Sequence, residues 1–257
     1  MLSQHVLQVA GVSKRFGGLQ ALNDVHLNIE RGQVYGLIGP NGAGKTTFFN
    51  VITGLYPADS GSFVLAGQAY QPKEVHLVAK AGIARTFQNI RLFAEMTALE
   101  NVMVARHVRT HSGLLGAIFR TTAFQREEKE ITEKARDLLA YVGIEVFADV
   151  KARTLSYGDQ RRLEIARALA TDPQLLALDE PAAGMNATEK VQLRALIDKI
   201  RLDHRTVLLI EHDVKLVMGL CDRVTVLDEG QVIAEGSPTQ VQHDPRVMQA
   251  YLGTAQV

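Results

Sequence analysis

The sequence predicts an α/β fold with a largely parallel sheet and an inserted helical segment. Three observations carry this prediction. An apolar run at 34–38 enters the glycine-rich loop 39–44, and helical periodicity follows. Strand and helix patterns alternate again after residue 160, which is typical of a parallel sheet with helices on both faces. Between these parts, residues 89–156 show helical patterns and no convincing strand.

The first third of the chain mixes strands and turns. Residues 25–29 alternate between apolar and polar side chains, which indicates a half-buried strand. The continuous apolar run at 34–38 predicts a buried strand, and 44–53 predicts a helix that ends before Gly54. Residues 63–65 lie between glycines and predict a short strand.

The middle of the chain predicts a helical subdomain. Thr97 and Glu100 form a capping-box pattern at the start of a helix that reaches about Arg106. Residues 126–141 carry apolar side chains at helical spacing. The segment 107–125 carries basic side chains beside apolar ones, which fits either a packed helical elaboration or contact with a membrane subunit or lipid headgroups.

The last third alternates regularly. Asp228-Glu229-Gly230 lies between two short apolar runs and predicts a hairpin turn. Helices are expected at 163–170, 191–200 and 214–220, and strands at 175–178, 207–210, 224–227 and 231–234.

Composition narrows the class of protein. The 257 residues are 46% apolar and 22% charged, which is ordinary globular composition. Lys plus Arg and Asp plus Glu both number 28, so a strongly basic, nucleic-acid-coating surface is disfavoured. Cys221 is the single cysteine, which excludes an internal disulfide and fits a reducing compartment. We expect neither a membrane span nor a secretory signal, because the apolar runs are short.

A complete phosphate-binding pattern stands between the buried strand and the first helix. Gly39-Pro-Asn-Gly-Ala-Gly44-Lys45-Thr46 fits GxxxxGK[ST], whose backbone N–H groups wrap a polyphosphate. Lys45 is expected to reach the β- and γ-phosphates, and the Thr46 hydroxyl is expected to bind Mg²⁺. The expected ATP-binding residues of this loop are Gly39, Pro40, Asn41, Gly42, Ala43, Gly44, Lys45, Thr46 and Thr47.

An acidic pair completes the chemistry that such a loop requires. The apolar strand 175–178 brings Asp179 to its carboxyl end, where open α/β sheets bind ligands. We expect Asp179 to hold Mg²⁺, directly or through water, and Glu180 to activate the attacking water as a general base. Alone, this pair is typical of a solvated loop, and the phosphate-binding loop makes the catalytic interpretation the better one.

A motif at 155–159, before the acidic pair in the chain, indicates a family. Leu155-Ser-Tyr-Gly-Asp159 before a helical run resembles the signature motif of ABC ATPases, usually Leu-Ser-Gly-Gly-Gln. The resemblance implies that Leu155, Ser156, Tyr157, Gly158 and Asp159 contact ATP held by an opposing subunit. Tyr157 and Asp159 depart from the usual residues. Because an acidic side chain repels phosphate, we expect Asp159 to point away or to cap its own helix.

Other positions resemble the rest of the ABC set, in the same order along the chain. Phe16 resembles the aromatic residue that stacks on adenine, where tyrosine is more usual. Gln88 resembles the glutamine that senses Mg²⁺ and joins the two subdomains, and His212 resembles the switch histidine that contacts the γ-phosphate. Asn186 occupies a position where aspartate is common. The resemblance therefore implies catalytic roles for Glu180 and His212.

A finer resemblance covers about residues 5–253. Phe-Gly-Gly-Leu-Gln-Ala-Leu22, Ile-Ala-Arg-Thr-Phe-Gln-Asn89 and Ala-Tyr-Leu-Gly253 are similar to the LivG-type ATP-binding subunit of bacterial branched-chain amino acid importers. This implies a P-loop, RecA-like ABC ATPase core with a small antiparallel β subdomain and an inserted helical subdomain. The implied bounds are a single ABC domain at 5–253, a nucleotide-binding core at 5–88 and 157–237, a helical subdomain at 89–156 and a C-terminal helical extension at 238–257.

The resemblance also implies a working assembly. Two ATP-binding subunits, identical or paralogous, would pair head to tail with ATP and Mg²⁺ between them. Closure and hydrolysis would drive transmembrane permease subunits, which would contact a segment near Gln88–Arg106. The chain would lie on the cytoplasmic face of the bacterial inner membrane, and a periplasmic amino-acid-binding protein would choose the solute.

Two alternatives remain open at this point. A non-transport ABC ATPase for DNA repair would normally carry long coiled-coil or zinc-binding insertions, which this chain lacks. An ABC subunit that powers export of a lipid or lipopolysaccharide would share the core motifs, so that only the finer resemblance favours import.

Overall fold

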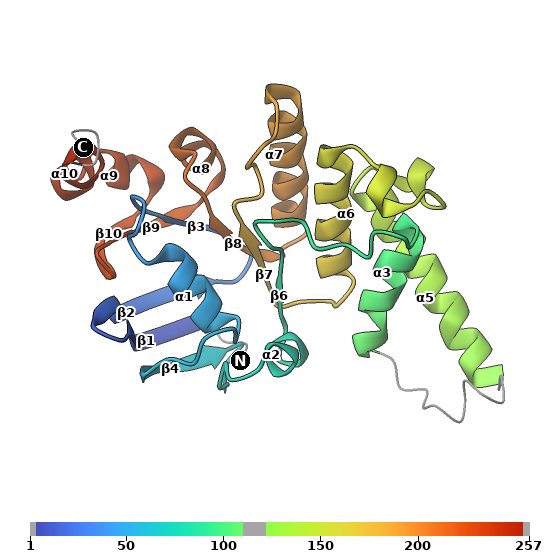
Figure 1. Cartoon of the computed structure of the whole chain (residues 1–257), viewed down its shortest axis with the longest axis horizontal. Coiled ribbons are helices and arrows are strands. Elements are labelled where there is room, and N and C mark those ends of the chain that lie inside the picture. The colour runs from blue at the N-terminus through green and yellow to red at the C-terminus, as the bar shows by residue number, and fades with distance from the viewer. Residues whose placement is uncertain (1–3, 110–121, 254–257) are drawn as a thin grey trace. The chain divides into compact units, whose positions relative to one another are not determined.

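The computed structural model describes residues 4–109 and 122–253 (Figure 1). The chain divides into two compact units, Met1–Gln88 with Gln174–Val257, and Asn89–Pro173. Most of the segment 107–125, for which membrane contact was one expectation, lies outside the described residues. Within the two described ranges, no helix is both long enough and apolar enough to cross a membrane.

A six-stranded sheet is the centre of the first unit. Its strand order is β10-β9-β3-β8-β7-β6, and all neighbours are parallel except β10, which pairs with β9 as an antiparallel edge. The strands are β3 (Val34–Ile38), β6 (Ile83–Arg85), β7 (Leu175–Asp179), β8 (Thr206–Ile210), β9 (Arg223–Asp228) and β10 (Gln231–Gly236). The predicted α/β fold class and the hairpin are confirmed, and positive φ at Glu229 and Gly230 shapes the hairpin turn.

An antiparallel sheet of four strands belongs to the same unit. Its order is β2-β1-β4-β5, formed by β1 (His5–Phe16), β2 (Leu19–Glu30), β4 (Ser60–Leu65) and β5 (Gln68–Ala69). Sequence patterns predicted parts of β2 and β4 but missed β1. The pairing of β1 with β2 shifts register between Val9 and Val12, so the alternation of buried and exposed side chains is broken along β1.

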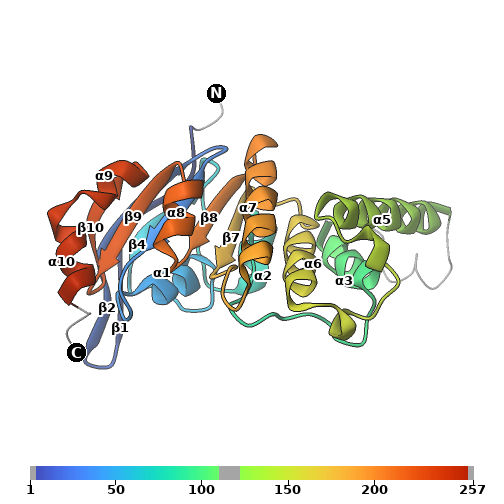
Figure 2. The same ribbon diagram turned by 90° about the horizontal axis from the view of Figure 1, so that it is seen from above.

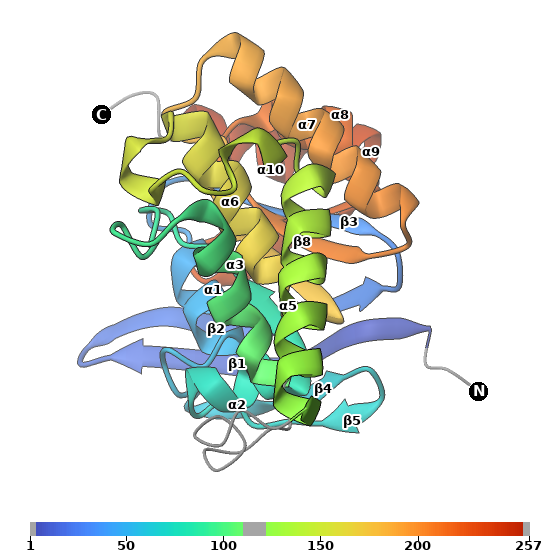
Figure 3. The same cartoon turned by 90° about the vertical axis from the view of Figure 1, so that its right-hand side faces the viewer.

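Helix α1 (Lys45–Ile52) packs in the core that both sheets share. Phe48, Phe49 and Ile52 of α1 are fully buried with Tyr35 and Leu37 of β3 and with apolar residues of β1 and β2. Figure 3 shows the layers of this unit, with the antiparallel strands and α1 on one side of the parallel strands and α7–α9 on the other. The remaining helices are α2 (Val75–Ala81), α7 (Ala187–Leu202), α8 (Val214–Leu220), α9 (Pro238–Gln242) and α10 (Pro245–Gly253).

Three helices form the core of the second unit and pack against one another (Figure 2). They are α3 (Ala98–Arg106), α5 (Thr122–Tyr141) and α6 (Tyr157–Leu169), with short 3-10 turns at 107–109, 145–147 and 152–154. The predicted capping box is confirmed, because Thr97 accepts a hydrogen bond from the Glu100 N–H and the Glu100 carboxylate accepts one from the Thr97 N–H. The described part contains one isolated β-bridge, Thr97 with Lys151, and no strand.

Candidate functional site

The loop between β3 and α1 forms a cradle of backbone groups. Gly39, Gly42 and Gly44 have positive φ, and a side chain at Gly39 would collide with the carbonyl oxygen of Leu227. Lys45 begins α1, and its ammonium group donates to the carbonyl oxygens of Gly39 at 2.7 Å and Pro40 at 2.9 Å. Burial lowers the pKa of Lys45 from its usual value, and the negative charge of Glu180 offsets part of this shift. The lysine is thus held inside the loop by two of its backbone carbonyls.

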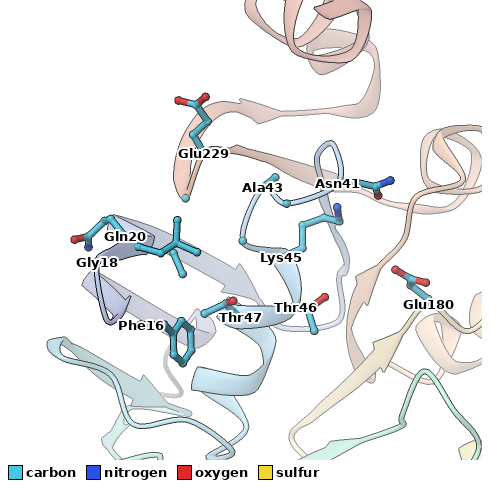
Figure 4. Close-up of a pocket in the computed structure, with 15 residues that line it drawn as sticks. Phe16, Gly18, Gln20, Asn41, Ala43, Lys45, Thr46, Thr47, Glu180 and Glu229 are labelled. Atoms are coloured by element: carbon cyan, nitrogen blue, oxygen red, sulfur yellow. The ribbon is translucent and has the colours of Figure 1, made fainter. Parts of the chain in front are cut away.

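A cavity of about 670 Å³ opens over this cradle (Figure 4). Residues of the β1–β2 turn, residues 41–47, Glu180 and the Glu229–Gly230 turn line it. Phe16 lies at one end and Glu180 at the other. The Phe16 ring is 42% exposed and meets Tyr56 edge-on, with ring centroids 5.3 Å apart. An exposed aromatic face, a phosphate cradle and a carboxylate therefore follow one another along a single cavity.

Asp179 ends β7 as a buried carboxylate beside a cation. Its Oδ2 lies 3.7 Å from Nη2 of Arg85, which ends β6. The Arg85 guanidinium also donates to Thr53 and Asn50 at the end of α1, and it stacks over Phe49 and Phe87. Arg85 thereby joins the strand before Gln88, the helix after the cradle and the Asp179 carboxylate.

Three predicted site residues meet beyond the end of β7. The Gln88 amide donates to Glu180 Oε2 at 2.8 Å, and His212 Nδ1 lies 3.7 Å from the same oxygen. Glu180 has a φ of +44°, in the left-handed region that a non-glycine residue rarely adopts. The backbone N–H of Glu180 donates to the Ile210 carbonyl at 2.9 Å, which ties this turn to the end of β8.

The donor set that the sequence predicts fits magnesium. Mg²⁺ prefers oxygen ligands and usually binds one or two carboxylates together with substrate phosphates. Thr46, Asp179 and Gln88 offer hydroxyl, carboxylate and amide oxygens. Among the residues that the structure describes, no group of three or more His, Cys, Asp or Glu could hold a metal. Oxygen donors of these kinds suit an ion that takes its remaining ligands from substrate phosphates and water.

The signature residues belong to the unit Asn89–Pro173, where Ser156 caps α6. The Ser156 hydroxyl accepts from the Asp159 N–H at 3.2 Å and donates to the Asp159 carboxylate at 2.6 Å. The same carboxylate lies 2.7 Å from Nη2 of Arg162. The prediction that Asp159 turns toward its own helix is confirmed, since these contacts are all within the N-terminal turns of α6.

The exposed Tyr157 contacts a buried arginine–glutamate pair on α6. Its hydroxyl accepts from Arg161 Nη2 at 3.2 Å, and Arg161 Nη1 donates to Glu164 at 2.7 Å. Glu164 also accepts from the Arg91 N–H at 3.4 Å. Arg161 is fully buried and Glu164 is 4% exposed. The tyrosine that departs from the usual signature thus partners a buried arginine.

Replacing Arg161 with methionine is expected to destabilise the helical unit by about 3–5 kcal/mol, because it leaves the Glu164 carboxylate buried without its charged partner. The double change Arg161→Met with Glu164→Leu removes both charges and is expected to recover most of that loss. Urea unfolding followed by circular dichroism measures both variants. Arg153→Met, at an exposed pair with Glu95, is the matched control and should leave the midpoint nearly unchanged. A double variant less stable than Arg161→Met would contradict this account.

Two further residues, Arg85 and Glu211, lie at the site and were not predicted from the sequence. Arg85 stands three positions before Gln88, and Glu211 stands directly before His212. The signal for both was a charged residue at the end of an otherwise apolar strand. Glu211 is fully buried, and its carboxylate accepts a hydrogen bond from the N–H of Ala182, two residues after Glu180.

The glycine-rich loop between strand β3 and helix α1 has the form of a phosphate-binding loop, and strand β7 of the same sheet ends in a carboxylate. Together these features define a P-loop nucleotide-binding protein. Residues 22–183 match the family model described as ABC transporter, and residues 231–257 match that of the branched-chain amino acid ATP-binding cassette transporter. The chain therefore belongs to the ABC transporter family and is an ABC ATPase that binds ATP.

Individual relatives agree with this assignment. The chain is 50% identical over 255 residues to the high-affinity branched-chain amino acid transport ATP-binding protein BraF of Pseudomonas aeruginosa, covering 99% of this chain and 100% of BraF. It is 46% identical, with the same coverage, to the protein of the same description called LivG in Escherichia coli K12. The solved ADP conformation of MJ1267, an ATP-binding cassette of an ABC transporter, superposes with a TM-score of 0.84 at 33% identity, covering 98% of this chain and all of that one.

Proposed function

We propose that this chain is the ATP-hydrolysing subunit of an importer of branched-chain, hydrophobic amino acids. The match of residues 231–257 to the C-terminal family model of branched-chain amino acid transporters carries this proposal. The nearly full-length identity to BraF and LivG supports it. In this function the whole segment 5–253 acts as one ABC domain, and its direct substrates are ATP and water.

The cavity over the cradle is the nucleotide site. Phe16 stacks on the adenine ring, residues 39–47 wrap the phosphates, and Lys45 neutralises the β- and γ-phosphates. The cavity supports this assignment because the exposed Phe16 ring and the buried Lys45 lie along it. Thr46, Asp179 and Gln88 would hold Mg²⁺, which would neutralise phosphate charge when bound.

Glu180 is the general base, and His212 and Gln88 position the reacting groups. The Glu180 carboxylate takes a proton from the attacking water, while the His212 ring contacts the γ-phosphate. Their proximity at one carboxylate oxygen supports these roles. The left-handed backbone at Glu180 turns its side chain toward the cavity, and the end of β8 holds that turn.

The signature residues Leu155–Asp159 serve an opposing subunit in a head-to-tail dimer. Ser156 and the first N–H groups of α6 form an anion-binding helix start for the ATP of the partner. The Asp159 carboxylate contacts Arg162 and Ser156 of its own helix, so its negative charge is compensated there. This supports the role, because an uncompensated carboxylate would repel phosphate. The partner is a second copy or a paralogue of this chain.

Membrane permease subunits complete the transporter at the cytoplasmic face of the bacterial inner membrane. The capped helix α3 is the surface that we assign to them, and a periplasmic amino-acid-binding protein acts through them. Lipid or lipopolysaccharide export and DNA repair are the rival functions. The C-terminal family match favours import over both, and balanced charge disfavours nucleic acid.

Amino acid uptake tests the proposal. A bacterial strain without the gene for this chain should lose uptake of radiolabelled leucine, isoleucine and valine, and the parent chain should restore it. The Lys45→Ala chain, expressed to the same level, should not restore this uptake. Uptake of lysine and glutamate should be the same in all strains. Unchanged leucine uptake in the deletion strain, together with a defect in lipid export or DNA repair, would overturn the proposal.

A further inference from the structure

Glu211 is a fully buried carboxylate that the reaction scheme above does not use. It follows β8 and precedes His212. Its Oε1 accepts from the Ala182 N–H at 2.9 Å, and its Oε2 accepts from the N–H groups of His212 at 3.2 Å and Asp213 at 3.5 Å. Burial raises the pKa of the Glu211 carboxyl, and these backbone donors oppose that shift. One side chain therefore joins two separate loops.

The first loop carries Glu180 in an unfavourable backbone conformation. A φ of +44° costs free energy for a non-glycine residue and persists only when its surroundings hold it. Two adjacent residues supply that restraint. The Ile210 carbonyl accepts from the Glu180 N–H at 2.9 Å, and the Glu211 carboxylate accepts from the N–H of Ala182, two residues further on. Ile210 and Glu211 thus accept hydrogen bonds from the turn on both sides of Pro181, at Glu180 and at Ala182.

The second loop carries the switch histidine. Glu211 accepts from the His212 backbone, and its Oε2 lies 3.9 Å from His212 Nδ1. The imidazole therefore has the Glu180 carboxylate at 3.7 Å and the Glu211 carboxylate at 3.9 Å. Beyond it, Asp213 caps α8 and pairs with Lys190 at 2.8 Å, which fixes the far end of the loop.

We propose that Glu211 is a positioning residue that fixes Glu180 and His212 relative to each other by fastening the loop 180–182 to the loop 211–213. It touches neither nucleotide nor water in this scheme and acts through the two residues that do. The proposal rests on the proposed roles of Glu180 and His212, and it adds the residue that sets their spacing. Reacting groups displaced by about 1 Å can lose about 100-fold in rate, so such a fastening has a measurable effect.

Two substitutions separate positioning from stability. Glu211→Gln keeps the shape, but its NH₂ group faces one set of backbone donors, so at least one loop loses its acceptor. Glu211→Leu removes every acceptor. Glu235→Gln is the matched control. The Glu235 carboxylate also accepts hydrogen bonds from two side chains of the same unit, Tyr35 and Arg223. Glu235 belongs to β10 and takes no part in the contacts of Glu180.

The full chain purified with its membrane partners serves for steady-state ATP hydrolysis, ATP binding and hydrogen exchange. We expect kcat to fall about 10-fold in Glu211→Gln and about 100-fold in Glu211→Leu, with KM for ATP and ATP affinity within about twofold of the parent. The Ala182 amide should exchange at least about tenfold faster in both variants. Glu235→Gln should keep the parent kcat.

Combining each change with Glu180→Gln identifies the route of action. If Glu211 acts through Glu180 as well as His212, the double variant should lose less than the two single losses combined in single-turnover measurements, because only the His212 part of the effect remains. A parental kcat in Glu211→Gln, an equal loss of ATP affinity, or full additivity with Glu180→Gln would overturn the proposal. Parental hydrolysis by Glu180→Gln alone would instead overturn the base assignment, so the two failures are distinguishable.

Discussion

Replacing Lys45 with alanine should remove tight ATP binding, and hydrolysis with it, while the fold stays intact. The Lys45 ammonium already lies inside the cradle, 2.7 Å from the Gly39 carbonyl, where β- and γ-phosphates would arrive. A hydrogen bond to a charged group contributes about 1.5–3 kcal/mol, and the lysine can donate three. Loss of two such bonds weakens binding at least about 100-fold. Isothermal titration calorimetry with Mg²⁺ and ATP measures this directly.

The matched control for this prediction is Lys80→Ala, on the exposed side of α2. It removes the same side chain from the same unit and should bind ATP like the parent. Circular dichroism and thermal unfolding of both variants would show whether the chain is folded. Parental affinity in a folded Lys45→Ala chain would refute the assignment of the cradle.

The sequence predicted those elements whose periodicity survives in the folded chain. The runs 34–38 and 207–210 became β3 and β8, whose residues are all buried, so a continuous apolar run was the right signal. The capping box at the start of α3 was equally predictable, because its two residues, Thr97 and Glu100, are only three positions apart. Motif residues of this kind are neighbours along the chain, which makes their chemistry visible without a fold.

Elements were missed where tertiary structure overrides local pattern. In β1, both Val6 and Leu7 are buried, and irregular register breaks the alternation that marks a strand. In α2, Val75 and Leu77 are exposed and Val78 is the buried residue, so the helix has hardly any apolar face. Both elements owe their stability to neighbours distant in sequence.

The same distinction applies to the candidate site. The P-loop residues, Asp179 with Glu180, and Ser156 with Asp159 are local sets. The P-loop pattern pointed to phosphate, the acidic pair gained its metal role beside that loop, and the signature role came from resemblance to ABC ATPases. Arg85 meets Asn50 and Thr53 on α1, and Glu211 meets Ala182 from another strand. Those contacts depend on which strands lie side by side in the sheet, and one sequence without its fold does not specify that.

Changing Glu180 to glutamine should let ATP bind but slow its hydrolysis about 100- to 10,000-fold, which corresponds to about 3–5 kcal/mol of barrier. Glutamine has the shape of glutamate and can still accept from the Gln88 amide, which now lies 2.8 Å from Glu180 Oε2. It cannot take a proton from water at neutral pH. Phosphate release under multiple turnover measures the loss, and Glu74→Gln, an exposed carboxylate before α2, is the control.

ATP that binds and persists should hold two subunits together, because in the proposed head-to-tail dimer the signature residues of one chain close over the ATP of the other. Size-exclusion chromatography of Glu180→Gln with Mg²⁺ and ATP should therefore show a dimer that is absent without nucleotide. Unimpaired hydrolysis by Glu180→Gln would remove this residue as the base. A monomer at every ATP concentration would contradict pairing of this chain with itself, and the same experiment with a paralogous ATP-binding subunit present then tests the composite site.

Adding Ser156→Arg to the Glu180→Gln chain should abolish this dimer without weakening ATP binding to its own P-loop. Ser156 begins α6, and a long side chain there would occupy the place of the partner's phosphate. Loss of the Ser156 cap costs about 1 kcal/mol, which leaves the unit folded. Ser62→Arg places the same bulk on exposed β4 and should leave the dimer intact. If the dimer tolerates Ser156→Arg, the composite site is wrong, because no phosphate then lies against the start of α6.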